Sequence, residues 1–135
     1  MINVLDHLAD PCRQLQTVHT ILAPGGILYM RFPNGAFHSF MARLSMRISS
    51  AKFINKFLVF HEYAFTPKAI AKILLDTGFT DVHVLNSPLT GGGFAIAGML
   101  KGLIGGVLKL IETLTRGRWL WGPSLDIFAQ KKTMN

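Results

Sequence analysis

The sequence is poor in cysteine and in charged residues, and each shortage excludes a class of protein. Cys12 is the only cysteine among 135 residues, so no disulfide can form within the chain, which fits a reducing compartment. Only 16% of the residues are charged, whereas 50% are hydrophobic, and this composition excludes an intrinsically disordered chain. A length of 135 residues accommodates one compact domain with a hydrophobic core.

Signals for export and for membrane insertion are also missing. Met1–Asp10 carries two aspartates and lacks the basic region that opens a secretory signal. Phe94–Ile111 is the most apolar stretch, but Lys101 and Lys109 lie inside it, and a central lysine costs about 2.5–3.5 kcal/mol to insert. We therefore expect a cytoplasmic protein in which this stretch lies on a surface, peripheral to a membrane at most.

Acidic residues are scarce, and the 14 basic residues outnumber the 7 acidic ones to leave a formal charge of +7. Such an excess is compatible with nucleic acid, anionic lipid or an acidic small molecule. The cluster Arg43, Arg47, Lys52 and Lys56 contains no acid. No nucleic-acid motif is found, and no basic stripe alternates with stacking aromatic residues, so nucleic acid is not an expected partner.

The first predicted unit is a helix followed by a strand. Asp10 is a suitable N-cap and Pro11 a suitable first helical residue, and Pro24–Gly26 ends the helix. Ile27–Phe32 is then a nearly continuous apolar run. Such a run is typical of a strand that is buried on both faces of a parallel sheet.

A second helix–strand unit follows, and one more strand closes the sheet. Thr66 and Pro67 begin the second helix, Gly78 ends it, and Phe79–Leu85 is predicted to be a strand. Ser124–Gln130 alternates apolar and polar residues, as a strand with one buried face does. The pattern predicts an α/β layer fold.

Two segments are not required by this sheet, and we interpret them as inserts. The first, at approximately 35–60, is basic and rich in phenylalanine, and the second, at approximately 91–122, is rich in glycine and aliphatic residues. The first is predicted to contain an amphipathic helix that covers the sheet or lies on a membrane. In the second, Gly98, Gly102 and Gly106 should meet the helices that flank the sheet, a second copy of the chain or a bilayer.

Three local patterns carry a family resemblance. Asn3–Pro11 leads into the first helix, Leu22–Gly26 is followed by the strand and then by Pro33-Asn34, and His61–Pro67 runs on to a Thr-Gly-Phe turn. In this order they resemble the class I S-adenosylmethionine (SAM)-dependent methyltransferases, in the branch that includes ubiquinone-pathway and methionine-pathway enzymes. Asp6 departs from the glutamate that this family often has there.

The resemblance implies a partial Rossmann-like methyltransferase sheet, with strands equivalent to the end of strand 4 and to strands 5, 7 and 6. Residues 1–135 would form a single partial domain, the C-terminal and substrate-side half. The family's glycine-rich loop and ribose-binding acid, which hold SAM, are not found in this sequence. We therefore expect weak or no SAM binding by this chain, no activity alone, and self-association through an exposed strand edge.

The resemblance also implies roles at the cofactor site. The backbone of Asn3 and Val4 would border SAM. His7 would face the reacting methyl group or the acceptor and act as a catalytic base, because histidine titrates near neutral pH. The alternative for this segment is a loop that approaches the helix and carries a solvated histidine.

Three further residues are predicted to bind the methyl acceptor. Asn34 leaves the fifth strand at the edge where the acceptor would sit, and His61 and Tyr63 would approach from the lid side. The alternatives are a Pro-Asn-Gly turn for Asn34 and packing or capping for the other two. The histidines and Cys12 do not have the spacing of a zinc site, so no metal is expected.

The resulting hypothesis is SAM-dependent methyl transfer to a small acceptor, and the apolar, basic inserts favour a hydrophobic or anionic one. The alternative is a non-enzymatic remnant of a methyltransferase that binds a membrane or a partner. A homo-oligomer is compatible with both hypotheses.

Overall fold

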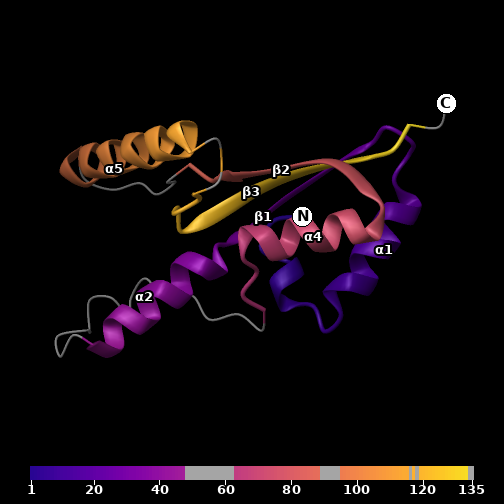
Figure 1. The fold of residues 1–135 in the computed structure, drawn as a ribbon, viewed down its shortest axis with the longest axis horizontal. Coiled ribbons are helices and arrows are strands. Elements are labelled where there is room, and N and C mark those ends of the chain that lie inside the picture. The colour runs from indigo at the N-terminus through magenta and orange to yellow at the C-terminus, as the bar shows by residue number, and fades with distance from the viewer. Residues whose placement is uncertain (48–62, 89–94, 116, 118, 134–135) are drawn as a thin grey trace.

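A computed structural model describes residues 1–47, 63–88, 95–115, 117 and 119–133 (Figure 1). Within these ranges the chain forms an α/β fold with a sheet at its centre. Its elements in chain order are η1 (Leu5–His7), α1 (Pro11–Ile21), β1 (Ile27–Pro33), α2 (Gly35–Arg47), α4 (Pro67–Thr77), β2 (Phe79–Asn86), α5 (Ala95–Leu114) and β3 (Ser124–Lys131).

The last strand lies in the middle of the sheet. The strand order is β1-β3-β2, and β3 is antiparallel to both neighbours, so β1 and β2 run parallel to each other. Beyond β1, Ile2 forms a parallel bridge with Arg31, and the Asn3 N–H donates to the Arg31 carbonyl at 2.8 Å. This arrangement reproduces the predicted order, from the end of strand 4 through strands 5, 7 and 6, and the predicted fold class is confirmed.

The predicted helix ends are confirmed because each is fixed by a short-range bond. Asp10 Oδ1 accepts from the Arg13 N–H at 2.9 Å, and Thr66 Oγ1 accepts from the Ala69 N–H at 3.2 Å. Gly78 ends α4 with a φ of 100°, a left-handed conformation that favours glycine.

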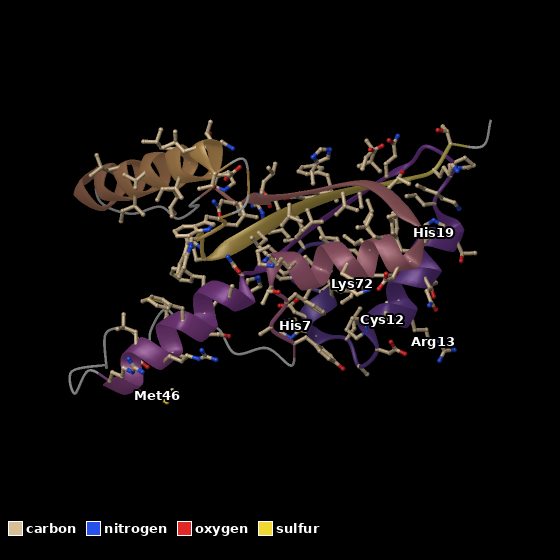
Figure 2. The ribbon with its side chains drawn as sticks, viewed as in Figure 1. His7, Cys12, Arg13, His19, Met46 and Lys72 are labelled. Atoms are coloured by element: carbon tan, nitrogen blue, oxygen red, sulfur yellow. The ribbon has the colours of Figure 1, made fainter. Side chains whose placement is uncertain are left out.

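The end of α1 contacts the start of β2 and the end of β3. Figure 2 shows His19 near the carboxyl end of α1, where its ring meets Phe79 edge-on with centroids 4.9 Å apart. Lys131 Nζ donates to the carbonyls of His19 and Leu22, both at 2.7 Å. These hydrogen bonds fasten the end of β3 to the end of α1.

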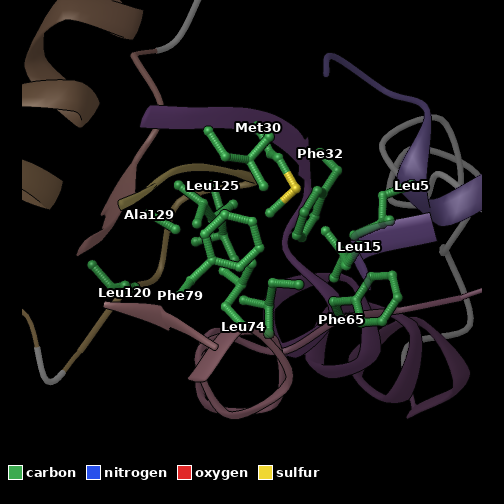
Figure 3. Close-up of a cluster of buried hydrophobic side chains, with 13 residues drawn as sticks. Leu5, Leu15, Met30, Phe32, Phe65, Leu74, Phe79, Leu120, Leu125 and Ala129 are labelled. Carbon is green, nitrogen blue, oxygen red and sulfur yellow. The ribbon is translucent and has the colours of Figure 1, made fainter. Parts of the chain in front are cut away.

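The core lies between one face of the sheet and these two helices. Leu15 of α1 and Ile70 and Leu74 of α4 are completely buried. The alternation predicted for β3 is confirmed, because its inward residues belong to the core. The strands contribute Leu28, Met30, Phe32, Phe79, Leu125, Ile127 and Ala129 (Figure 3).

The prediction that β1 is buried on both faces is wrong for this chain. Leu28, Met30 and Phe32 point into the core, but Ile27 on the other face is 64% exposed. The reason is that α1 and α4 both lie on one face of the sheet (Figure 1). On the opposite face, among the described residues, α5 approaches the sheet at β2 rather than at β1.

A polar cluster occupies the opposite face between β1 and β3. Arg31 donates to both carboxylate oxygens of Asp126, at 2.6 and 2.8 Å, and the Tyr29 hydroxyl donates to Asp126 Oδ1 at 3.0 Å. Burial by itself would raise the pKa of the Asp126 carboxyl, but the hydrogen bonds from Arg31 and Tyr29 outweigh it and hold the pKa below its ordinary value. The cluster therefore ties the two strands together with Asp126 ionised.

Among the described residues, nothing covers α5 at Gly102 and Gly106 of the predicted glycine stripe. A Cβ added to Gly102 or Gly106 would meet no atom of the described part of the chain within 4 Å, while the side-chain surroundings of Gly98 lie outside that part. Of the three predicted covering surfaces, the described sheet-flanking helices do not meet Gly102 or Gly106, and contact with a second copy or a bilayer stays a prediction. Within the described part of the chain, no helix is long and apolar enough to cross a membrane.

The lowered pKa of Asp126 predicts a loss of stability in acid. Its stabilising contribution is complete above the unfolded-state pKa of about 3.9 and disappears as the pH falls through the lower folded-state value. Urea unfolding of the wild type and of Asp126→Asn should show a clear gap in the free energy of unfolding at pH 7 that narrows below about pH 4.

The matched control for this experiment is Asp76→Asn. Asp76 is 63% exposed and forms a surface ion pair with Lys72, so this change should have little effect on stability at any pH. A difference in the free energy of unfolding between wild type and Asp126→Asn that is the same at every pH would contradict the lowered pKa of Asp126.

Candidate functional site

The carboxyl ends of the parallel strands meet at one edge of the sheet. β1 ends at Pro33 and β2 at Asn86, and Met1–Asn3 runs beside β1 in the same direction. Open α/β sheets bind ligands beyond this edge. The residues predicted to act on a cofactor or acceptor should therefore be judged by their positions here.

Asn3 and Val4 lie at this edge and are accessible. Asn3 has a φ of 49°, which is uncommon for a residue with a side chain, and its N–H is bonded to Arg31. Val4 is 42% exposed. The segment is thus held by its backbone while its outer side is open, and the predicted contact with a cofactor stays a prediction.

His7 and Tyr63 are brought to the same region. His7 is exposed in η1, whereas Leu5 and Asp6 beside it are buried (Figure 2). The Tyr63 hydroxyl donates to the Ala9 carbonyl at 2.9 Å, and its N–H donates to the Asp6 carbonyl at 3.3 Å. Tyr63 thus holds the segment that carries His7. The predicted roles of both residues remain untested, and His61 lies outside the described residues.

Asn34 occupies a different environment from the one predicted. Its side chain is completely buried, and its amide donates to the carbonyls of Leu120 and Gly122, both at 2.9 Å. Its Oδ1 accepts from the Ala36 N–H at 3.1 Å, as an N-cap does. This geometry favours the alternative of a structural turn, because both amide hydrogens are used within the protein, and the contact with an acceptor stays a prediction.

Gly35 is a residue that the sequence reasoning missed. A Cβ at this position would lie 2.5 Å from the backbone C and O of Ala64, and the Gly35 N–H donates to the Phe65 carbonyl at 2.9 Å. The start of α2 therefore touches the approach to α4, backbone against backbone. The only sequence signal is the glycine that directly follows Pro33-Asn34.

A cavity of about 330 Å³ opens beside these contacts. Its walls are mainly apolar and aromatic, and among the described residues that line it Lys68 is the charged one. Three parts of the chain form the lining: Ala36 and Phe37 at the start of α2, Thr66–Lys68 at the start of α4, and Trp119–Trp121 before β3. This volume is in the range of sites that bind small molecules.

A larger cavity of about 800 Å³ runs along the outer edge of β2 between α4 and α5. It shares Pro67, Lys68, Trp119 and Leu120 with the smaller cavity, so the two are neighbours. We take the smaller one as the candidate acceptor site, because Asn34 and Gly35 at the end of β1 position its walls. No group of three potential metal ligands is found among the described residues, and the absence of a metal site stays a prediction.

Replacing Asn34 tests its structural role. Asn34→Ala should lower the free energy of unfolding by at least about 2 kcal/mol, because the buried carbonyls of Leu120 and Gly122 would lose their donor. Chemical denaturation measures this loss. Ser39→Ala, at an exposed position of α2, is the control and should change stability by no more than about 0.5 kcal/mol. Equal stability of the two variants would restore the acceptor-binding hypothesis for Asn34.

Comparison with known families finds a match over residues 1–84, to a family model described as a methyltransferase domain. This match covers more than half of the 135 residues. None of the curated proteins matches the chain at a significant level.

Solved structures with the same fold include SAM-dependent methyltransferases. One from Thermotoga maritima, described as a possible histamine N-methyltransferase, has a TM-score of 0.57 at 15% identity, over 98% of this chain and 54% of its own. One from Mesorhizobium loti has a TM-score of 0.54 at 18% identity, over 96% of this chain and 59% of its own. The CurJ carbon methyltransferase has a TM-score of 0.51 at 21% identity, over 98% of this chain and 29% of its own. The chain thus spans little more than half the length of the first of these structures.

Proposed function

The chain belongs to the methyltransferase domain family, and we propose that it forms the acceptor side of an enzyme that methylates a small apolar or anionic molecule with SAM. The observation that carries this proposal is the aromatic cavity at the carboxyl edge of the sheet, with the charged Lys68 among the described residues that line it. It has the size and the lining of a small-molecule site.

The residues of this chain fit part of SAM. The exposed segment Asn3–Val4 at the strand edge would border the cofactor, as open α/β sheets bind ligands there. When bound, SAM supplies an electrophilic methyl group on its sulfonium. The contacts to its ribose and methionine ends would come from residues outside these 135, because neither the glycine-rich loop nor the ribose-binding acid of this family is found among them.

The work of this chain is to position the acceptor and to exclude water. Phe37, Trp119 and Trp121 would bury an apolar ring or chain, and Lys68 would pair with an acidic group on it. Orientation is the main requirement, since methyl transfer needs the nucleophile in line with the bond that breaks. For a hydroxyl nucleophile, His7 would accept the proton as transfer proceeds.

A non-enzymatic remnant that binds a membrane or partner is the second candidate function. The observation that favours it is α5, whose outward apolar residues are exposed in the described part of the chain, with Leu103 70% and Leu114 74% exposed. The two candidates differ in what the aromatic cavity does, because only the first requires it to bind a small molecule.

Calorimetry of the 135-residue chain with SAM tests how much of the cofactor site is present. We expect no binding at micromolar concentration, because Asn3–Val4 alone would contact a small part of the cofactor. A micromolar dissociation constant for the monomeric chain would show instead that these residues hold SAM by themselves.

Fluorescence tests the acceptor cavity independently of SAM, because Trp119 and Trp121, the chain's two tryptophans, both line it. A small aromatic acid such as 4-hydroxybenzoate should quench them in a saturable manner, and Lys68→Met should weaken its binding about three- to five-fold through the lost charge pair. The control is Lys72→Met, one turn further along α4 and outside the lining. Quenching that does not saturate, or that Lys68→Met leaves unchanged, would favour the remnant.

A further inference from the structure

Helix α5 exposes a continuous apolar stripe. Leu103, Val107, Leu110 and Leu114 are 70%, 52%, 59% and 74% exposed. Their spacing of four, three and four residues places them on one side of the helix. The opposite side faces the sheet, where buried Glu112 accepts from the backbone and side-chain nitrogens of Asn86 at 3.3 and 3.0 Å. The helix is thus fixed to the sheet by its polar side and presents its apolar side outward.

The first insert presents a second exposed surface of similar chemistry. On α2, Phe40 is 46% and Met46 79% exposed, and Arg43 and Arg47 are also exposed. Figure 2 places Met46 at the outer end of this helix. α2 and α5 extend past the same end of the sheet (Figure 1). The contact between the Phe40 and Trp121 rings, with centroids 5.0 Å apart, joins the base of α2 to the segment that follows α5.

The net charge of the protein is confined to these inserts. Segment 35–60 has four basic residues and no acid, and segment 91–122 has four basic residues and one acid, Glu112. The remaining residues hold six basic and six acidic side chains. The body of the sheet is therefore neutral, and the two inserts account for the entire charge of +7.

We propose that α2 and α5 dock the protein on an anionic lipid surface, with the outward apolar residues in the headgroup region and the exposed Arg43 and Arg47 of α2 against the headgroups. This combination of exposed apolar side chains with cations is how interfacial helices bind membranes. The proposal does not rest on the proposed function, because it depends only on the exposure and the charge of the inserts.

A second copy of the chain fits this surface less well. α5 has 20 residues and is about 30 Å long, so a helix pair about 10 Å wide would bury about 300 Å² on each partner, against about 800 Å² in a stable interface. Two copies would also bring together the segments that carry all of the net positive charge. An anionic bilayer has neither problem.

Sedimentation with vesicles tests the docking. The full chain should bind vesicles of equal parts phosphatidylglycerol and phosphatidylcholine, bind pure phosphatidylcholine at least about ten-fold more weakly, and lose affinity as salt is raised. The emission of Trp119 and Trp121 should shift to shorter wavelength on binding, because both follow α5 and Trp119 is 62% exposed.

Paired variants separate the inserts from the rest of the surface. Arg43→Gln with Arg47→Gln should weaken binding to anionic vesicles about thirty-fold, and the control Arg13→Gln with Lys132→Gln removes the same charge from the neutral body. Leu103→Ser with Leu110→Ser should weaken binding at least about ten-fold. Its control, Ile21→Ser with Leu75→Ser, changes residues that are 77% and 57% exposed outside the inserts. Thermal melts should be unchanged, because all of these side chains are at the surface.

Equal binding to both kinds of vesicle would overturn the proposal, and so would equal losses in the insert variants and their controls. Analytical ultracentrifugation checks the rival occupant. The stripe would be assigned to a second copy of the chain if the protein does not bind anionic vesicles and forms concentration-dependent dimers that Leu103→Ser with Leu110→Ser abolishes.

Discussion

The rest of the structure depends on the pairing of β3 with both β1 and β2. β3 is formed by residues near the end of the chain, yet it lies between strands that precede it. Leu125 and Ile127 complete the core on one of its faces, while Asp126 is tied to Arg31 on the other, across a separation of 95 residues. Without β3, β1 and β2 would have no common neighbour, and α1 and α4 would have no continuous surface to cover.

The same pairing builds the candidate site. Because β3 is antiparallel to its neighbours, the segment that leads into it must pass the carboxyl ends of β1 and β2. There it supplies Trp119–Trp121 to the cavity, and the carbonyls of Leu120 and Gly122 to Asn34. These buried hydrogen bonds leave few alternative conformations for the segment, because breaking one would leave a carbonyl buried without a donor. The walls of the site are thus set by the sheet that they adjoin.

Local features were predictable from the residue types, whereas the non-local contacts of individual side chains were not. The bonds that fix the helix ends at Asp10 and Thr66 span three residues, so the residue types are sufficient evidence for them. The strand order followed from the resemblance. By contrast, the environment of Asn34 depends on carbonyls 86 and 88 residues away, and that of Gly35 on the backbone of Ala64. An apolar run such as Ile27–Phe32 reports the hydrophobicity of a strand, but the number of its faces that are covered depends on which helices lie beside it.

The proposed acceptor cavity and the proposed lipid-docking surface share residues. Apart from Thr66–Lys68, the lining of the acceptor cavity comes from the two charged inserts: Phe37 from the first, Trp119 and Trp121 from the second. A protein seated on lipid through α2 and α5 would therefore hold this cavity close to the headgroup region. An apolar acceptor dissolved in the bilayer would then reach Phe37 and the tryptophans without crossing water, and the cost of exposing its apolar surface would be avoided. Lys68, which lines the cavity, would select among such molecules for those with an acidic group, so the proposed apolar and anionic preferences would belong to one acceptor.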